Sequence, residues 1–361
     1  MASRRLVIVT GTLVLAVAFV TALVVPRFVP GLRAPIPVAA GALPPLARAN
    51  AWFDTAPLTA DSLRGRPVAL LFWRDTDPLG LAALPVAEAW YREFAPLGAR
   101  VVAVHEAEFS FAQHPAVAAA VAKRLGLSLP VADDSTGFIE GLLGGMDEGP
   151  RVVVADASGR LVSDTVAALA QGQRALAGAV RDARRAAGLA TPGELAPLDV
   201  SLPTGERTVH LGAGRVESGP LRVLPPGRDE VFTAEFRYEE SGEPWAPYPV
   251  GGWRTGVEGV LATRGGAANF IAIRYSAARA GVVVTPPAGG SAKFWILRDD
   301  RWQRPEERDE DVTADARGAG SVLVTEPRIY WLDRGTGTRV LKISPETPGA
   351  TVNAFVFTGA R

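Results

Sequence analysis

Residues 70–85, LLFWRDTDPLGLAALP, join an apolar run of strand length to a segment with the spacing of an amphipathic helix. Such a junction can hold a reactive pair of cysteines, but the chain of 361 residues contains no cysteine at all. Disulfides, zinc thiolates, iron–sulfur clusters and thiol catalysis are therefore excluded for this chain. The helical segment begins instead at Asp77, which is followed by Pro78.

The Asp77-Pro78 pair has the character of a helix start. Aspartate accepts backbone N–H groups at an N-cap, and proline is pre-shaped for the first helical position. The residue before a proline also avoids helical backbone angles, as an N-cap residue does. We interpret Asp77 as an N-cap, with direct contact to a ligand as the alternative.

A second group of ionisable residues, His105, Glu106 and Glu108, comes at the end of the apolar run 99–105. If the strand continues, residues 106 and 108 share one face and residue 105 lies on the other. This alternation splits the group, so we predict hydrogen bonding at a strand end and no metal site. The sequence also lacks a phosphate-binding loop, a nucleophile elbow and a zinc-binding helix motif, and no cofactor is expected.

The N-terminus contains 20 consecutive residues without a charge, at positions 6–25, behind Arg4 and Arg5. A run of this length can cross about 30 Å of hydrocarbon, and the preceding arginines favour a cytoplasmic N-terminus. We predict a single-pass anchor over residues 1–27, with the remainder on the extracytoplasmic side, periplasmic or at the cell surface. A cleaved signal peptide is the alternative. Residues 28–50 are rich in proline and alanine, which predicts a linker.

The remaining chain is long enough for two domains. Residues 51–190 alternate strand and helix patterns, which predicts an α/β sheet covered by helices on both faces. Residues 191–198 form a second linker, and residues 199–361 consist of short alternating segments that predict a β-sandwich. The formal net charge is zero and no long charged run occurs, so we expect no nucleic-acid partner.

Several residues of the first domain resemble those of a known family in order and spacing. Around the junction these are Phe72, Trp73, Leu84, Pro85, Trp90 and Tyr91, and after the second strand they are His105, Glu108 and Phe109. The segment resembles the thioredoxin-like domain in the C-terminal region of DipZ-type cytochrome-biogenesis and thiol–disulfide proteins. The stretches 127–134 and 149–161 resemble later parts of that domain.

The resemblance implies a thioredoxin-like α/β sandwich in which the two family cysteines fall on Asp77 and Gly80. A carboxylate cannot attack a disulfide and leave again as a thiol does, so we expect a redox-inactive domain. Pro150 corresponds to the family's cis-proline and lies either in a simple turn or in a surviving peptide groove. The isomer of its peptide bond cannot be read from the sequence. The candidate groove residues are Trp73, Asp77, Pro150, His105 and Glu108.

The second domain resembles the carbohydrate-binding-module-like, jelly-roll-like sandwich that follows the thioredoxin-like domain in DipZ-type proteins. Residues 253–277 carry much of this resemblance. Aromatic faces can stack on sugars or peptides, and the binding candidates are Trp245, Tyr248 and Trp253. We expect the stretch WAPYP at 245–249 to be exposed, because its two prolines do not fit a central strand.

These observations predict a membrane-anchored, extracytoplasmic binding or scaffold protein rather than an enzyme. The expected partner is an extracytoplasmic protein, peptide or carbohydrate. The alternatives are a thiol–disulfide oxidoreductase of the cytochrome-biogenesis type, which the resemblance alone would suggest, and an unknown non-thiol activity at Asp77.

Overall fold

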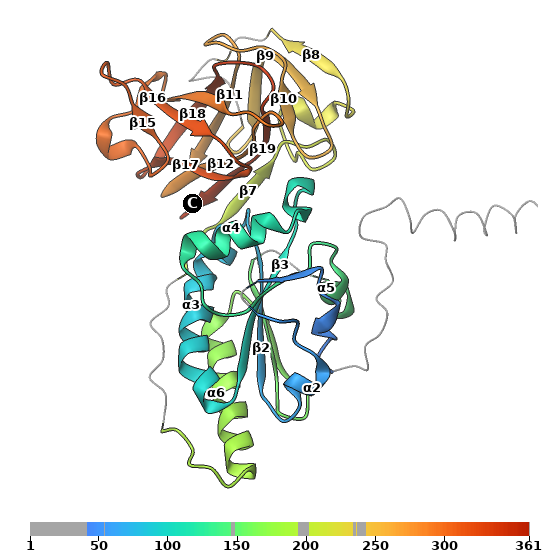
Figure 1. Cartoon of the computed structure of the whole chain (residues 1–361). Helices are drawn as coiled ribbons and strands as arrows, with labels where there is room; N and C mark the ends of the chain where they lie inside the picture. Colours follow the sequence, from blue (N-terminus) through green and yellow to red (C-terminus); the bar gives the residue numbers. More distant parts are fainter. Residues whose placement is uncertain are drawn as a thin grey trace, which may run out of the picture.

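The chain forms an α/β domain followed by an antiparallel β domain (Figure 1). A computed structural model describes residues 42–53, 55–145, 149–193, 202–233, 236 and 243–360. The predicted membrane anchor at residues 6–25 lies outside this described part. Within the described part, no helix combines the length and the apolar character needed to span a membrane.

The α/β domain is built on a sheet of six strands in the order β1-β4-β3-β2-β5-β6. Strands β2, β3 and β4 run parallel to one another, and each other neighbouring pair is antiparallel. The central strands are continuous apolar runs because both faces of the sheet are covered. The strands are β1 (Ala51–Phe53), β2 (Val68–Arg74), β3 (Arg100–Glu106), β4 (Val131–Asp133), β5 (Arg151–Ala155) and β6 (Leu161–Val166).

Helices cover both faces of this sheet, as the alternating pattern predicts. In Figure 1, α3, α4 and α6 lie on one face and α2 and α5 on the other, and each face has its own apolar core. The helices are α2 (Ala60–Leu63), α3 (Pro78–Phe94), α4 (Ala116–Leu125), α5 (Phe138–Leu142) and α6 (Leu169–Ala186). Short 3₁₀ turns add η1 (Leu46–Arg48), η2 (Ala95–Leu97) and η3 (Ser110–Gln113).

The end of the stretch assigned to the first linker, residues 42–50, packs on the α/β domain instead. Leu46 is only 1% exposed within the core that α2 and α5 cover. The N–H of Leu43 donates to the carbonyl of Gly159 at 2.9 Å, beside an isolated bridge between Ala42 and Arg160. Within this proline- and alanine-rich stretch, Leu46 belongs to the core of the α/β domain and Leu43 packs against that core. The domain therefore begins before residue 51.

The β domain contains 13 strands in its described part, and all their pairings are antiparallel. Strand β9 pairs with β11 near its start and with β10 near its end, so it joins the two parts of the sheet. Both parts bury one shared core. The strands are β7 (Arg207–His210), β8 (Asp229–Phe232), β9 (Pro247–Thr255), β10 (Val260–Ala262), β11 (Phe270–Ser276), β12 (Arg279–Thr285), β13 (Ala292–Arg298), β14 (Arg301–Trp302), β15 (Thr313–Ala314), β16 (Gly320–Val324), β17 (Arg328–Arg334), β18 (Thr338–Pro345) and β19 (Thr351–Thr358), with the 3₁₀ turns η4 (Pro220–Val223) and η5 (Pro305–Glu307).

Strand β9 also corrects the expectation for residues 245–249. Pro247 and Pro249 lie inside the strand, opposite Ile273 and Ile271 of β11. Among the described residues this end of β9 pairs with β11 alone, so a strand with two missing N–H donors is tolerated. Farther along, Gly251 has φ 90° and a Cβ there would lie 2.1 Å from Oδ1 of Asn269, so only glycine fits the bend.

The β domain packs on the α/β domain beyond the end of β3, where Figure 1 shows it next to α4. Phe109 follows β3 and is 1% exposed, because it inserts among side chains of the β domain. These neighbours are Val283, Ile329, Ala354 and Val356, with Leu81, Phe111 and Trp331 at the edge of the cluster. The two domains therefore share a small apolar core.

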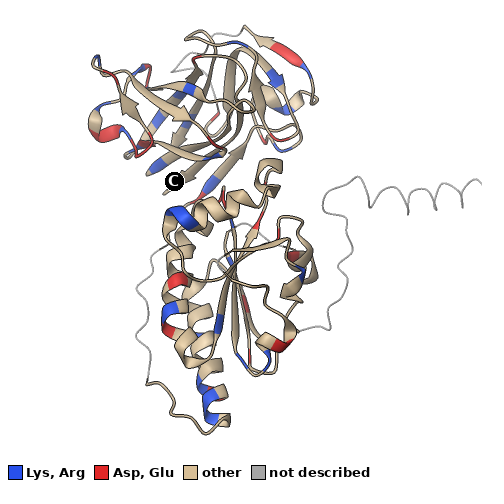
Figure 2. Ribbon diagram, viewed as in Figure 1, with Lys and Arg blue, Asp and Glu red and all other residues tan. Residues whose placement is uncertain are grey.

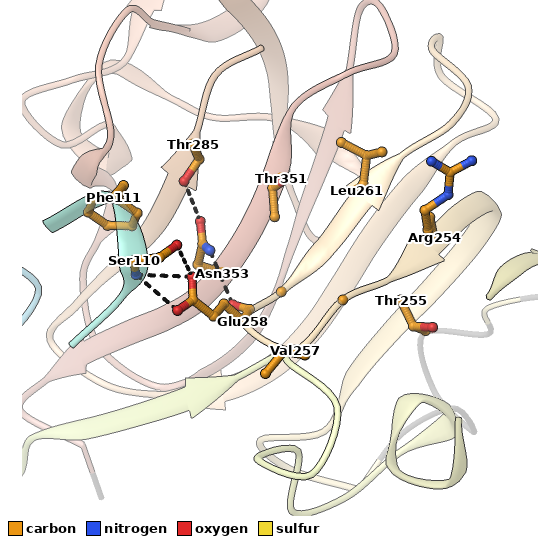
Figure 3. A pocket seen from close by; sticks show the side chains of 12 residues that line it. Ser110, Phe111, Arg254, Thr255, Val257, Glu258, Leu261, Thr285, Thr351 and Asn353 are labelled. Atoms are coloured by element: carbon orange, nitrogen blue, oxygen red, sulfur yellow. Dashed lines mark hydrogen bonds between the residues drawn. The ribbon is translucent and has the colours of Figure 1, made fainter. Parts of the chain in front are cut away.

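Polar contacts surround this shared core. Figure 3 shows Ser110 facing Glu258 across the boundary between the domains. The Ser110 N–H donates to both carboxylate oxygens at 2.9 and 3.1 Å, and its hydroxyl donates to one of them at 2.6 Å. Hydrogen bonds to a charged acceptor are directional and strong, so they fix the orientation that the apolar contact stabilises.

Phe109→Ala should uncouple the two domains. Truncation of a buried phenylalanine costs about 3–5 kcal/mol, and here the loss falls on the interface. We expect urea unfolding, followed by tryptophan fluorescence and circular dichroism, to separate into two transitions. Phe94→Ala is the control, because Phe94 is fully buried inside the α/β domain. If Phe109→Ala and Phe94→Ala gave the same single transition, the interface would not depend on Phe109.

Candidate functional site

The start of α3 carries the candidate residue Asp77. Its Oδ1 accepts the backbone N–H of Leu79 at 2.9 Å and Pro78 occupies the first turn, so the predicted N-cap is confirmed. Gly80 allows this arrangement. A Cβ at Gly80 would lie 2.9 Å from Oδ2 of Asp77 and 3.2 Å from the backbone nitrogen of Arg74. Asp77 and a side chain at position 80 would therefore compete for the same space.

A carboxyl group of the β domain meets Asp77 at this helix start. Glu206, just before β7, lies with its Oε1 3.4 Å from the Leu79 N–H, and its side chain hydrogen-bonds with Asp77. Burial raises the pKa of Asp77, and this effect outweighs the hydrogen bonds from Glu206, Leu79 and Gly80 and the charge of Arg74. Two carboxyl groups bond to each other only when one of them carries a proton. The contact therefore favours a state in which Asp77 and Glu206 together hold one proton.

Glu108 lies between the domains rather than in an open groove. Its Oε2 accepts the hydroxyl of Thr76 at 2.7 Å, and its Oε1 accepts Nη2 of Arg215 in the β domain at 2.8 Å. The ring of His210 is 3.4 Å from the same oxygen, and burial, as the largest effect, lowers the pKa of that histidine. Through these contacts, Glu108 joins the end of β3 to the β domain.

His105 lies beneath this interface in a fully buried set of polar side chains. Its Nδ1 is 2.9 Å from Asp133 and its Nε2 is 3.4 Å from Asp75. Burial lowers the pKa of His105, but the hydrogen bonds and negative charges of Asp133 and Asp75 outweigh burial and raise it to about 9. The ring is therefore a cation held between two carboxylates at neutral pH, which confirms the predicted hydrogen-bonding role at a strand end.

Glu106 is separated from His105, as strand alternation predicts. It is 4% exposed, and Nη2 of Arg74 lies 3.9 Å from its Oε2. Burial, followed by the negative charge of Glu140, raises its pKa well above the ordinary value. The residues that the structure describes contain no group of three side chains able to hold a metal ion.

Two other groove candidates, Trp73 and Pro150, do not line a groove. Trp73 is fully buried and its ring centroid lies 4.8 Å from that of His105, because it belongs to the continuous apolar run of β2. Pro150 is buried as well, its preceding peptide bond is trans, and its carbonyl accepts the N–H of Ala167. The groove candidates predicted from the sequence thus divide into two kinds. Asp77 and Glu108 lie at the domain interface, whereas Trp73, His105 and Pro150 are buried inside the α/β domain.

The aromatic candidates of the β domain do not converge. Trp253 is fully buried in the core, so its expected role in binding is wrong. Trp245 is half-buried and packs edge-on against Phe357 at 5.0 Å between ring centroids. Tyr248 is half-buried and lies 5.5 Å from Phe236. Strand alternation distinguishes the two faces of a sheet but not which face is covered.

A cavity of about 690 Å³ opens between the two domains, close to the start of α3. Its walls combine side chains of α3 and α4 with side chains of β12 and β17 and the segment before β17. The lining residues are Asp75, Pro78, Leu81, Ala82, Arg124, Leu125, Pro203, Arg279, Glu310, Asp311, Glu326, Arg328, Ile329, Trp331 and Thr358. Sequence reasoning missed this site, because no local pattern shows which residues of two domains will face each other.

A smaller hollow of about 420 Å³ includes Ser110 and Glu258 in its lining (Figure 3). Thr285 and Asn353 also line it and are hydrogen-bonded to each other at 2.9 Å. Asn353 also donates to the backbone carbonyl of Glu258 at 3.1 Å. The prominent polar groups of this hollow are thus engaged in holding the loop of Glu258. We take the larger interdomain cavity, which has the buried Asp75 in its lining, as the candidate binding site.

No family model matches the sequence, and no curated protein matches it. Among solved structures, a thioredoxin-like protein in its oxidised form is 21% identical and aligns with 38% of this chain and 96% of its own, with a TM-score of 0.35. A thiol-disulfide isomerase from Corynebacterium glutamicum is 20% identical over 33% of this chain and 81% of its own, with a TM-score of 0.28.

A secreted disulfide oxidoreductase of Mycobacterium tuberculosis is 19% identical over 31% of this chain and 76% of its own, with a TM-score of 0.26. These values say nothing about activity. The fold of the α/β domain follows from its own strand order and from the helices on both faces of the sheet, without these comparisons. The α/β domain is thioredoxin-like. The chain contains no cysteine, and an antiparallel β domain with 13 strands in its described part follows the α/β domain.

Asp77→Asn should stabilise the protein at pH 7. A carboxyl group with a raised pKa in the folded state favours folding when protonated, and this stability is lost as the pH rises above its ordinary value of 3.8. Asparagine keeps the capping oxygen and cannot ionise, so the gain over the parent should shrink towards pH 4. Asp77→Ala loses the cap and should be less stable than Asp77→Asn by about 0.5–2 kcal/mol. Urea unfolding across this pH range measures all three proteins, and equal stability of the two variants would contradict the capping role.

His105 should contribute stability that disappears at alkaline pH. Its pKa is raised in the folded state, so the contribution is complete below 6.5 and is lost as the pH rises through about 9. A shift of this size corresponds to about 3 kcal/mol, which His105→Gln should remove. The titration of the ring resonances by NMR gives the pKa directly, with the exposed His114 as the internal control. A His105 resonance that titrates near 6.5 would be inconsistent with the ion pairs.

Proposed function

We propose that this chain is a membrane-anchored, extracytoplasmic binding protein that holds its ligand between a redox-inactive thioredoxin-like domain and the β domain. The observation that carries the proposal is the interdomain cavity of about 690 Å³ at the start of α3. Part of this end of the α/β domain is covered by Phe109 and its neighbours from the β domain. The remaining space is large enough for several side chains or a small ligand.

The absence of cysteine supports binding over thiol–disulfide exchange. Exchange requires a thiolate that attacks a disulfide sulfur, and this chain contains none. In the resemblance to DipZ-type proteins the two thiol positions fall on Asp77 and Gly80. Asp77 caps its own helix and hydrogen-bonds with Glu206. These contacts support a role in folding and domain docking rather than a reactive group.

Two further parts of the proposal rest on the sequence. The uncharged run at residues 6–25 supports an anchor in the membrane, and the two arginines before it support a location of the two domains outside the cytoplasm. The resemblance of residues 253–277 to a carbohydrate-binding-module-like sandwich supports a binding role for the β domain. Because Trp253 is fully buried, the interdomain cavity is a better candidate for the ligand site than the aromatic residues named from the sequence.

Photo-crosslinking in intact membranes tests where the ligand binds. A photoreactive phenylalanine analogue at position 125 would lie at the cavity rim, because Leu125 lines the cavity and is 40% exposed. The same analogue at position 189 is the matched control, because Leu189 is 54% exposed beyond α6 and does not line the cavity. We expect an adduct of defined mass at position 125 only. The absence of an adduct at 125, or identical adducts at both positions, would count against the proposal.

A further inference from the structure

The interdomain cavity runs from an exposed rim to a buried carboxylate. At the rim, Leu125 is 40% exposed and the side chains of Arg124 and Glu326 are 44% and 51% exposed. Asp75, which also lines the cavity, is only 2% exposed. Figure 2 shows charged residues on both domains where they meet. The ligand that fits such a cavity must therefore complement charge as well as shape.

The three arginines that line the cavity are already paired. Arg124 lies 3.7 Å from Glu326, and Arg328 lies 2.6 Å from Asp311. Arg279 is bound by Glu310 at 3.1 Å and by Asp309 at 2.7 Å. These ion pairs use the three carboxylates of the lining that belong to the β domain. They leave little positive charge for an anionic ligand.

Asp75 is the carboxylate of the lining that these ion pairs do not neutralise. Its Oδ1 lies 3.4 Å from Nε2 of His105, but that histidine is closer to Asp133, at 2.9 Å. One imidazolium thus serves two carboxylates. Oδ2 of Asp75 is buried and has no hydrogen-bond partner among the residues that the structure describes. A buried carboxylate oxygen without a donor is costly, and a ligand that supplies the donor recovers that cost.

We propose that the interdomain cavity binds a primary ammonium group against Asp75. This inference rests on the proposed binding function and names the chemistry of its ligand. The one oxygen of Asp75 without a donor suits an ammonium, which acts as a compact point charge. A guanidinium is less suited, because it binds carboxylates best through both oxygens and Oδ1 is engaged with His105.

The wall beside Asp75 also defines the rest of the ligand. Leu81, Ile329 and Trp331 line the cavity and belong to the apolar cluster between the domains. An ammonium on an apolar stem with an apolar neighbour matches this wall. A lysine side chain in a peptide has this chemistry, and so does a free alkyl diamine.

Calorimetry on the full-length protein in detergent micelles tests the proposal with three probes. These are the tripeptide acetyl-Phe-Lys-Phe-amide, its norleucine counterpart acetyl-Phe-Nle-Phe-amide, and cadaverine. Lysine and norleucine differ in the ammonium group and are similar in their apolar stem. We expect at least tenfold weaker binding of the norleucine peptide. Binding of cadaverine without binding of the lysine peptide would identify a free amine as the source, and the reverse would identify a peptide.

Asp75→Asn removes the charge and keeps the shape of the side chain. It should weaken binding of the ammonium probe at least tenfold and leave binding of the norleucine peptide unchanged. Asp61→Asn is the matched control, because Asp61 is an exposed carboxylate paired with Arg64 in α2, outside the cavity. The comparison of lysine with norleucine on the parent protein needs no variant, so a folding defect in Asp75→Asn does not affect it.

The outcomes separate this inference from the proposed function. Equal binding of the lysine and norleucine peptides, unchanged binding by Asp75→Asn, or no binding of any probe overturns the ammonium site. A specific adduct at position 125 alongside any of these results would leave the binding function in place with a different ligand. Failure of both the probes and the crosslink would reject the two together.

Discussion

The insertion of Phe109 into the β domain is the contact on which the candidate site depends. Phe109 comes directly after β3, so its burial brings the β domain to the end of the sheet where α3 starts. The approach of Glu206 to Asp77 and of Arg215 to Glu108, and the cavity walls from β12 and β17, follow from that position. An apolar contact supplies the attraction, because the surrounding carboxylates could not hold the domains together alone.

The start of α3 shows how the electrostatic field of a helix N-terminus can serve the structure of a protein rather than a reaction. A helix N-terminus stabilises negative charge, whether that charge belongs to a thiolate or to a carboxylate. Asp77 uses this field to cap the helix through Leu79, and Gly80 leaves the space that its carboxylate needs. Burial at the domain boundary raises the pKa of Asp77, and this effect outweighs the hydrogen bonds that the carboxyl group accepts. The same helix end that could activate a nucleophile therefore serves here as a docking point between domains.

The parts of this structure that the sequence could predict are those set by local pattern. The strand–helix junction at 70–85, the N-cap at Asp77 and the separation of His105 from Glu106 all follow from neighbouring residues. The positions of three other residues depend on strands or on a domain far away in the sequence. These residues are Trp253, Pro247 and Phe109. Trp253 proved to be core rather than surface, and Pro247 lies in a strand because β9 is paired on one side there among the described residues. The cavity itself is a property of two domains together.

Asp75 and Asp77 are two residues apart, but their carboxyl groups differ in how fully they are hydrogen-bonded within the protein. Backbone N–H groups at the helix start and the side chain of Glu206 engage Asp77, so its carboxyl is part of the structure. Asp75 precedes the helix start and lines the cavity, and it shares the ring of His105 with Asp133. A turn of the chain between β2 and α3 therefore separates a carboxyl group that holds the fold from one that is free to bind. In the proposed binding function, recognition by charge needs no thiol, which agrees with a chain that contains no cysteine.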